Sequence, residues 1–167
     1  WVMDTREADP VWQSVNHTKV NTFGQEVTVN VQWSMVNGQL AYCHLHQQKQ
    51  EADYLQSQYS LEYLRHKVTT HLTLRLGSIL SPLTPHLSPL NLTLGYRWQD
   101  RMGQYTTTDG EVKDYQPYSI IDARLAWTKD TYSIYLEGNN LTSHRYVDYG
   151  NVPQPGCWIT GGMKLFL

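Results

Sequence analysis

The sequence has little cysteine, little excess charge and a modest apolar content, and each shortage excludes a class of protein. Among its 167 residues, 13 Lys and Arg stand against 15 Asp and Glu, giving a net charge of -2. Nucleic-acid-binding domains are normally basic, so this balance argues against one. Hydrophobic residues make up 40% of the chain, so we expect no helical membrane span. The two cysteines, Cys43 and Cys157, are too few for a disulfide framework, and whether they pair is left open.

The start of the chain lacks the features of a signal peptide. It begins at Trp1, which is followed by neither a basic segment nor an apolar core. We therefore expect a processed product or a segment of a longer protein.

The aromatic residues are unevenly represented, because six Trp and twelve Tyr occur beside only two Phe. Trp and Tyr carry a polar tip on an apolar body, and they are favoured where one end of the side chain is dry and the other is wet. Together with the low net charge and the modest apolar content, the excess of Trp and Tyr leaves two classes of protein: a small soluble β-domain or a membrane β-barrel.

Apolar and polar residues alternate with a period of two along much of the chain, which is typical of strands with one apolar face. The alternation is strongest at residues 26–33, 68–76, 90–99 and 121–127, and weaker at 11–17, 39–48, 132–139 and 157–167. We therefore predict an all-β, antiparallel, up-and-down transmembrane β-barrel with about eight strands present, each near the ~10 residues of a tilted membrane strand. The alternation fits equally a soluble barrel whose apolar face points inward.

The connections between these strands differ in length at the two ends of the predicted sheet. The pair Asn37-Gly38 predicts a tight type I′ hairpin, and Lys129-Asp130 predicts a second short turn. These two turns lie at the same end of the predicted sheet as the proline-bearing link at residues 78–89. The other end carries the long polar loops at residues 49–65, 102–116 and 141–156. The short link at residues 21–24 also lies at that end and is the exception. Long loops on one side and short turns on the other are typical of outer-membrane barrels.

Three aromatic residues lie next to the short turns, on the apolar parity of their strands: Trp33, Trp127 and Tyr132. Such positions match a membrane-interface girdle, at the junction of hydrocarbon and headgroups. The alternative is that they cap the core of a soluble barrel.

The last fifty residues carry several motifs in a specific order. The Asn140-Leu141 pair follows a predicted strand, Tyr146 comes shortly after, and Pro155-Gly156 precedes the final strand, which ends Leu165-Phe166-Leu167. Over roughly residues 117–167 this order resembles the C-terminal end of a TonB-dependent outer-membrane receptor of the siderophore, haem and cobalamin type. Two positions depart from the family pattern: Cys157 stands where the family has Arg, and Leu167 stands where it has a terminal Phe.

The resemblance implies a barrel of 22 strands with a separate plug domain inside it, of which residues 1–167 would be a C-terminal segment without the plug. It implies residence in the bacterial outer membrane, in contact with its lipid, and transport energised by the TonB complex through the plug. The transported ligand would be a ferric siderophore, haem or cobalamin. A signal for the barrel-assembly machinery is implied at Thr160, Gly162, Leu165 and Leu167.

The family resemblance implies that ligand is captured in the long loops, where Tyr and Arg residues gather. The candidate ligand-binding residues are Arg101, Tyr105, Tyr115, Arg145, Tyr146 and Tyr149. Aromatic faces with occasional guanidinium groups suit a flat, anionic or macrocyclic ligand.

No catalytic motif and no cofactor-binding motif stands out, so we expect neither an enzyme nor a bound cofactor. His44 and His46 share one face of a strand and are weak candidates for a metal site, with water-facing or loop-proximal side chains as the alternative. Asp122 and Glu137 suggest paired carboxylates, but a polar ladder with Arg75, Arg97 and Arg124 is the stronger interpretation.

Two other functions remain open at this stage. One is a complete eight-stranded outer-membrane protein with a structural or adhesive role, and the other is a soluble ligand-binding barrel.

Overall fold

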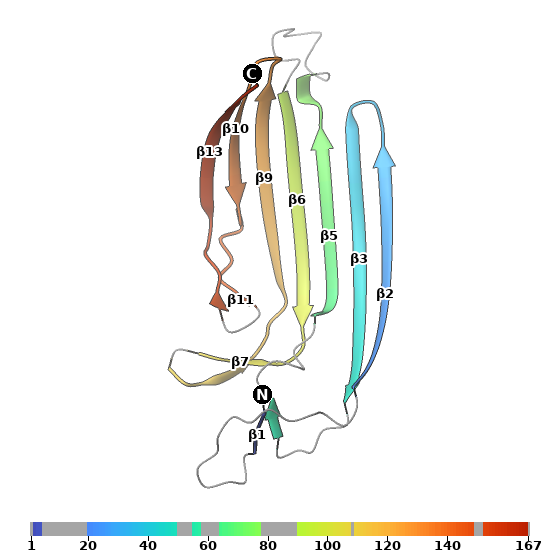
Figure 1. The fold of residues 1–167 in the computed structure, drawn as a ribbon, viewed down its shortest axis with the longest axis vertical. Coiled ribbons are helices and arrows are strands. Elements are labelled where there is room, and N and C mark those ends of the chain that lie inside the picture. The colour runs from blue at the N-terminus through green and yellow to red at the C-terminus, as the bar shows by residue number, and fades with distance from the viewer. Residues whose placement is uncertain are drawn as a thin grey trace.

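A computed structural model describes residues 2–4, 20–49, 55–57, 64–77, 90–107, 109–148 and 152–166. Its main element is a seven-stranded antiparallel sheet in the order β13-β10-β9-β6-β5-β3-β2, in which neighbours in space are neighbours along the chain (Figure 1). The strands are β2 (Val20–Gln32), β3 (Val36–Lys49), β5 (Leu64–Leu74), β6 (Leu90–Arg101), β9 (Tyr118–Thr128), β10 (Tyr132–Asn139) and β13 (Trp158–Leu165). In the described part of the chain, β2 and β13 are the edges of this sheet.

Three two-stranded ribbons accompany the sheet. They are β1 (Val2–Asp4) with β4 (Leu55–Ser57), β7 (Gln104–Thr106) with β8 (Val112–Asp114), and β11 (Val147–Asp148) with β12 (Val152–Pro153). The all-β, antiparallel class and seven of the eight predicted strands are confirmed. The eighth, at residues 11–17, lies outside the described residues. No helix in the described ranges is long and apolar enough to cross a membrane.

The two faces of the sheet differ in chemistry. Pairing brings the apolar positions of all seven strands into common rows, for example Leu72 beside Leu94 and Ile134 beside Met163. This apolar face is uncovered in the described structure, since Val29 is 51% and Met163 63% exposed. The opposite face carries mainly polar side chains, with Ala41, Cys43 and Leu45 of β3 as exceptions, and we refer to it as the polar face. Register is specified by this alternation, because a slip of one residue would exchange the two faces.

The predicted turn at Asn37-Gly38 is wrong. β2 and β3 are joined at Ser34-Met35, where the Trp33 amide donates to the Val36 carbonyl at 2.8 Å and the Val36 amide returns a bond at 3.3 Å. The apolar pattern explains the difference. The observed register sets Val29 opposite Leu40 and Val27 opposite Tyr42, whereas a turn three residues later would set these valines opposite polar side chains.

The short link expected at residues 21–24 is also wrong, because β2 runs unbroken from Val20 and pairs with β3 along its whole length. The turn at Lys129-Asp130 is confirmed: the Lys129 amide donates to the Tyr132 carbonyl at 2.8 Å between β9 and β10. The β7–β8 and β11–β12 ribbons lie at the opposite end of the sheet from these turns (Figure 1). We call the two ends the loop end and the turn end.

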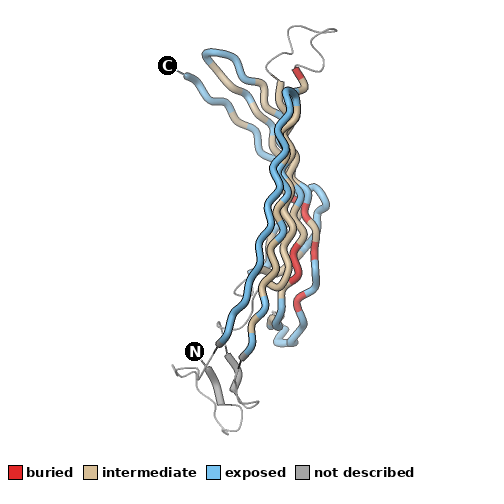
Figure 2. The backbone as a smooth tube through the Cα atoms, turned by 90° about the vertical axis from the view of Figure 1, so that its right-hand side faces the viewer, coloured by how far each residue is buried: buried red, intermediate tan, exposed pale blue. Residues whose placement is uncertain are grey.

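Most buried residues gather at the loop end, where the chain after β6 and β10 folds against the sheet (Figure 2). The buried apolar residues are Tyr115, Tyr118 and Ile120, and Ile120 is the least exposed at 2%. Gln99, Asp100 and Asn140 are the buried polar residues of the described ranges. The fold thus concentrates its packing at the end that holds the predicted ligand residues.

Candidate functional site at the loop end

The first part of the site is a group of aromatic rings above the end of β6. Tyr105, in β7, lies with its ring centre 5.3 Å from that of Tyr115. The Arg101 guanidinium, at the end of β6, lies 5.8 Å from the centre of the Tyr115 ring. The structure thus brings together three of the residues predicted to bind ligand.

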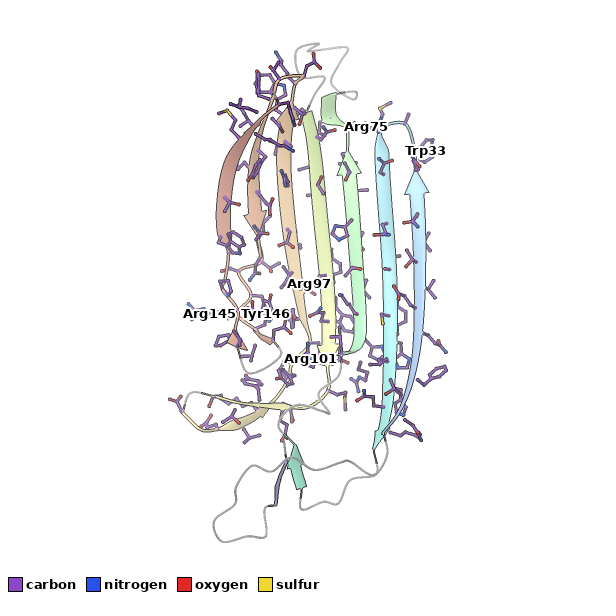
Figure 3. All side chains as sticks on the ribbon, viewed as in Figure 1. Trp33, Arg75, Arg97, Arg101, Arg145 and Tyr146 are labelled. Carbon is purple, nitrogen blue, oxygen red and sulfur yellow. The ribbon has the colours of Figure 1, made fainter. Side chains whose placement is uncertain are left out.

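The second part is the segment of residues 141–148, which folds back along the polar face and which we call the return segment. Its Tyr146 hydroxyl accepts a hydrogen bond from Arg97 at 3.2 Å, and the Tyr146 ring stacks on Tyr118 with centres 4.1 Å apart. Its Asp148 carboxylate accepts from Arg101 at 2.9 Å. Figure 3 shows Arg97, Arg101, Arg145 and Tyr146 in the half of the molecule nearer the loop end.

Asn140 anchors the start of the return segment. Its side-chain amide donates to the carbonyls of His144 at 2.8 Å and Pro155 at 2.9 Å, while its side-chain oxygen accepts from the Thr142 hydroxyl and the His144 amide. Its backbone amide donates to an Asp122 carboxylate oxygen at 2.7 Å. Asn140 has a φ of 49°, a left-handed conformation that Asn tolerates better than most residues. This network gives a physical reason for Asn at the position that the family resemblance singled out.

Two cavities border the return segment. One of about 470 Å³ is lined by Tyr105, Arg145, Tyr146 and Gln154, among others. Another of about 240 Å³ has Arg97, Asn140 and Tyr146 in its wall. Tyr146 therefore belongs to both walls. Tyr149, the remaining predicted ligand residue, lies outside the described residues.

Tyr118 has the most perturbed ionisation in the site. It lies at the loop end of β9, beyond the rows that form the apolar face, and burial, with a smaller contribution from the Asp148 charge, raises its pKa to about 12. The hydroxyl is protonated at neutral pH, as an ordinary phenol also is, and it donates to the Gln99 side-chain oxygen. A neutral phenol with its donor occupied offers a stable flat surface for the Tyr146 ring.

Sequence reasoning missed Tyr118 and Asp148 as parts of this cluster, and it placed Arg97 in a charge ladder. Arg97 and Tyr118 depend on contacts with the return segment, which is far away from them along the chain, and Asp148 lies in that segment and meets Arg101 of β6. Only the polar parity of Arg97 and Tyr118 on their strands could have indicated them beforehand.

The predicted polar ladder is partly present. Arg124 forms an ion pair with Glu137 at 3.4 Å, and the Asp122 carboxylate holds the Asn140 amide. Arg75 does not belong to it, because its side chain lies at the turn end and donates to the Ser34 carbonyl at 3.4 Å. No pairing of the two carboxylates with each other is required to explain these residues.

The histidines of β3 lie at the loop end on the apolar face, which corresponds to the loop-proximal alternative. His44 stacks on His66 of β5 with ring centres 4.7 Å apart, and His66 is hydrogen-bonded to the Tyr42 hydroxyl at 2.8 Å. His46 pairs opposite Phe23. Across the described ranges no group of three or more His, Cys, Asp and Glu side chains could hold a metal ion. Cys43 and Cys157 are both free.

Aromatic side chains border the apolar face at both ends. At the turn end, Trp127 and Tyr132 meet edge to face with centres 5.9 Å apart, and Trp33 is exposed in the β2–β3 turn. At the loop end, the Trp98 ring lies 6.4 Å from His66. The second group was missed in the sequence, although Trp98 has the apolar parity of its strand.

The residues of the implied assembly signal lie on the edge strand β13. Thr160 and Gly162 are on the polar face and Leu165 is on the apolar face, while Leu167 lies outside the described residues. The Tyr135 ring packs directly over Gly162, where an added Cβ would lie 2.6 Å from the ring carbon Cζ. The Arg124 guanidinium lies 4.1 Å from the centre of the same ring.

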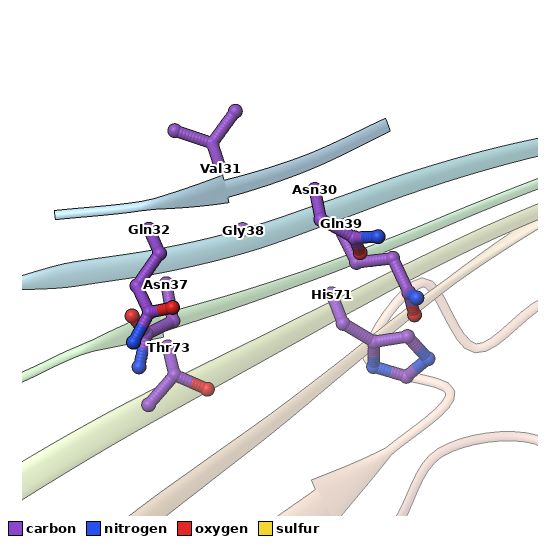
Figure 4. A pocket seen from close by; sticks show the side chains of 8 residues that line it. All are labelled: Asn30, Val31, Gln32, Asn37, Gly38, Gln39, His71 and Thr73. Atoms are coloured by element: carbon purple, nitrogen blue, oxygen red, sulfur yellow. The ribbon is translucent and has the colours of Figure 1, made fainter. Parts of the chain in front are cut away.

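A further hollow of about 370 Å³ lies at the turn end of the polar face. Figure 4 shows its lining by Asn30, Gln39, His71 and Thr73, among others. None of the predicted ligand residues lines it, so it is separate from the cluster at the loop end.

Comparisons with known proteins place this architecture. No family model matches the sequence, and no curated protein matches it. The fold is similar to that of the FrpB iron transporter from Neisseria meningitidis (F3-3 variant), with a TM-score of 0.64 and 15% identity over 86% of this chain and 23% of that chain. It is also similar to a chain in the structure of the FpvAI–pyocin S2 complex, with a TM-score of 0.60 and 13% identity over 86% of this chain and 19% of that chain. This chain therefore spans about a quarter or less of these two solved chains, and its fold is similar to that of a part of these TonB-dependent receptor barrels.

Proposed function

We propose that residues 1–167 form a C-terminal segment of an outer-membrane receptor that takes up a scarce metal chelate or a vitamin with energy supplied through TonB. The observation that carries the proposal is a single sheet whose two faces differ in chemistry. Its apolar face is uncovered and bordered by aromatic residues at both ends, and its polar face holds an Arg and Tyr cluster at the loop end. The first property suits lipid and the second suits capture of a ligand.

The dimensions of the apolar face support the membrane part of the proposal. It extends from the row of Leu90 and Trp127 to the row of Trp98 and Ser119, which are eight residues apart on each strand. At ~3.3 Å per residue this is about 26 Å along the strands, close to the ~25 Å apolar band of outer-membrane barrels. Trp33, Trp127 and Tyr132 would then form the girdle at one interface.

In this proposal the rest of the machinery lies outside the described residues. A plug domain and further strands would complete the barrel, the TonB complex would act on the plug, and the barrel-assembly machinery would recognise Thr160, Gly162, Leu165 and Leu167. The loop residues Arg101, Tyr105, Tyr115, Arg145, Tyr146 and Tyr149 would contact a ferric siderophore, haem or cobalamin.

The test is growth of a strain that lacks the gene for this chain. The strain is supplied with ferric siderophores, haem or cobalamin as its single source of iron or cobalamin, and the intact gene is restored as a control. We expect loss of growth on one class of source and recovery on complementation. Normal growth on all three, in conditions where the parent strain makes the protein, would contradict the proposal.

The two other functions predict different outcomes. A structural or adhesive barrel would change attachment or envelope integrity without changing growth on any source. A soluble barrel would stay monodisperse in buffer without detergent, whereas a sheet with this uncovered apolar face needs detergent or lipid.

A further inference from the structure

Two arginines on the polar face are bonded to the protein's own return segment. Arg97 and Arg101 lie four residues apart on β6, so both belong to the same face of the strand. Arg97 donates to the Tyr146 hydroxyl and Arg101 to the Asp148 carboxylate. A phenol and a carboxylate of the chain thus engage two guanidinium groups at the end where ligand would arrive.

Tyr146 lies between two cavities at this end of the sheet. It lines both the cavity of about 470 Å³, which Arg145 also lines, and the cavity of about 240 Å³, which Arg97 and Asp122 also line, and Gln154 and Pro155 share both walls with it. Outward movement of Tyr146 would widen both spaces. The larger space already falls within the ~300–1,000 Å³ of small-molecule sites, and an arginine lines each of the two.

The side-chain contacts that Tyr146 and Asp148 make with β6 and β9 are of a kind that a ligand can replace, whereas the backbone bond from the Gln154 amide to the Tyr146 carbonyl at 2.8 Å would move with the segment. The side chains of Arg101 and Asp148 are 15% and 32% exposed, so water reaches their ion pair. Tyr146 covers Tyr118 by stacking, with ring planes 24° apart, and any flat group could take that position. By contrast, the four side-chain hydrogen bonds of Asn140 hold the start of the segment in place.

We propose that the return segment is a latch that occupies an anion-binding site. Without ligand, Asp148 and Tyr146 engage Arg101 and Arg97. A flat anionic ligand takes over these guanidinium groups and the face of Tyr118, and the part of the segment beyond His144 turns outward. The proposal rests on the proposed function, because it specifies the ligand class of that site as flat and anionic. It also makes Asp148 a competitor of the ligand, so its removal should tighten binding.

The charges around the site agree with this direction. Arg97, Arg101 and Arg145 are the cations of the described cluster, and Asp148 and Asp122 are its anions. Asp122 is engaged with the Asn140 amide and stays with the anchor when the latch opens. Displacement of Asp148 therefore leaves a positive site for an incoming anion.

The experiment uses the protein as its gene encodes it, purified in detergent micelles, with phthalate as a flat dicarboxylate probe and its uncharged diamide as the comparison compound. Binding is measured by calorimetry for wild type, Asp148→Asn, Arg101→Gln and a matched control. The control is Glu111→Gln, which removes an equal charge from the exposed Glu111–Lys113 pair of the β7–β8 ribbon.

We expect Asp148→Asn to bind phthalate about tenfold more tightly than wild type, within the 5- to 150-fold range of couplings between sites. Glu111→Gln should equal wild type, Arg101→Gln should lose binding, and the diamide should not bind. A second measurement needs no substitution: phthalate should increase hydrogen–deuterium exchange in residues 141–148 of the wild-type protein.

Unchanged or weaker phthalate binding by folded Asp148→Asn would overturn the latch. Unchanged hydrogen–deuterium exchange in residues 141–148 at saturating phthalate would also overturn the latch. This measurement uses the wild-type protein, so it tests the latch even where a variant fails to fold. Both measurements are independent of growth. Growth of the deletion strain on all sources would therefore contradict the transport function without contradicting the latch. Normal transport together with no effect of phthalate would contradict the latch alone.

Discussion

The assignment of the two faces of the sheet can be tested with one substitution and its neighbour. Leu72 lies on the apolar face, midway between the two aromatic borders: its row contains Leu94, which is four residues from Leu90 and four from Trp98. At ~3.3 Å per residue, either border is about 13 Å away. An Arg at position 72 would therefore place its charge close to the middle of the proposed apolar band.

The expected cost follows from this position. Arg on the lipid-facing side of an outer-membrane barrel costs about 2–4 kcal/mol at the midplane, so Leu72→Arg should lower the folding equilibrium by a factor of about 30 to 900. The adjacent substitution His71→Arg places the same side chain on the polar face, in a hollow whose wall contains Asp122 and Glu137. We expect it to change stability by less than about 0.5 kcal/mol.

The measurement is urea unfolding of the intact protein in lipid vesicles, followed by Trp fluorescence, with heat-modifiability on gels as a check of assembly. The same titration in buffer without lipid separates a membrane barrel from a soluble one, because a soluble barrel would fold there and suffer from Leu72→Arg equally. A stability loss in His71→Arg that matches or exceeds that of Leu72→Arg would refute the assignment of the faces.

Two further substitutions test local contacts in the same protein. Gly162→Ala should slow assembly and lower thermal stability, because its Cβ would lie within 2.8 Å of the hydroxyl oxygen and two ring carbons of Tyr135. Gly161→Ala is the control, since its Cβ would lie 3.6 Å from the nearest atom, and equal effects of the two substitutions would contradict the packing argument. Asn140→Asp removes two amide donors from the carbonyls of His144 and Pro155, so the return segment should open more readily, at a cost of about 1–3 kcal/mol, measured as faster hydrogen–deuterium exchange in residues 141–148. Unchanged exchange there would show that Asn140 does not anchor the segment.

The alternation of side chains was enough to predict the strands and the two faces of most of them, as Leu94 and Arg124 illustrate. The weakly alternating β3 is the exception, because Tyr42 and His44 lie on the apolar face whereas Ala41, Cys43 and Leu45 lie on the polar face. Side chains alternate across a strand by its own geometry, so the parity of a residue holds whatever its neighbours are. The girdle residues at the turn end were found for the same reason, together with the short turn after β9. The likeness of the fold to TonB-dependent receptor barrels was likewise expected from motifs within one continuous stretch.

The position of the first turn shows where local signals fail. Asn37-Gly38 is a strong hairpin signal in two residues, but β2 and β3 pair over thirteen rows. The observed register pairs Val27 with Tyr42 and Val29 with Leu40, and it moves the turn to Ser34-Met35. Many weak pair contacts thus outweigh one favourable turn.

The site itself was decided by the tertiary structure. The sequence alone determined which of the described strands form, which face is apolar in each of them except β3, and that Tyr and Arg collect in the long loops, because these properties depend on residues close together in the chain. It did not determine that Asp148 meets Arg101, which is 47 residues away, or that Tyr146 stacks on Tyr118. Such contacts exist only after the return segment folds onto the polar face, and that depends on hydrogen bonds made jointly by β9, Asn140 and the chain before β13.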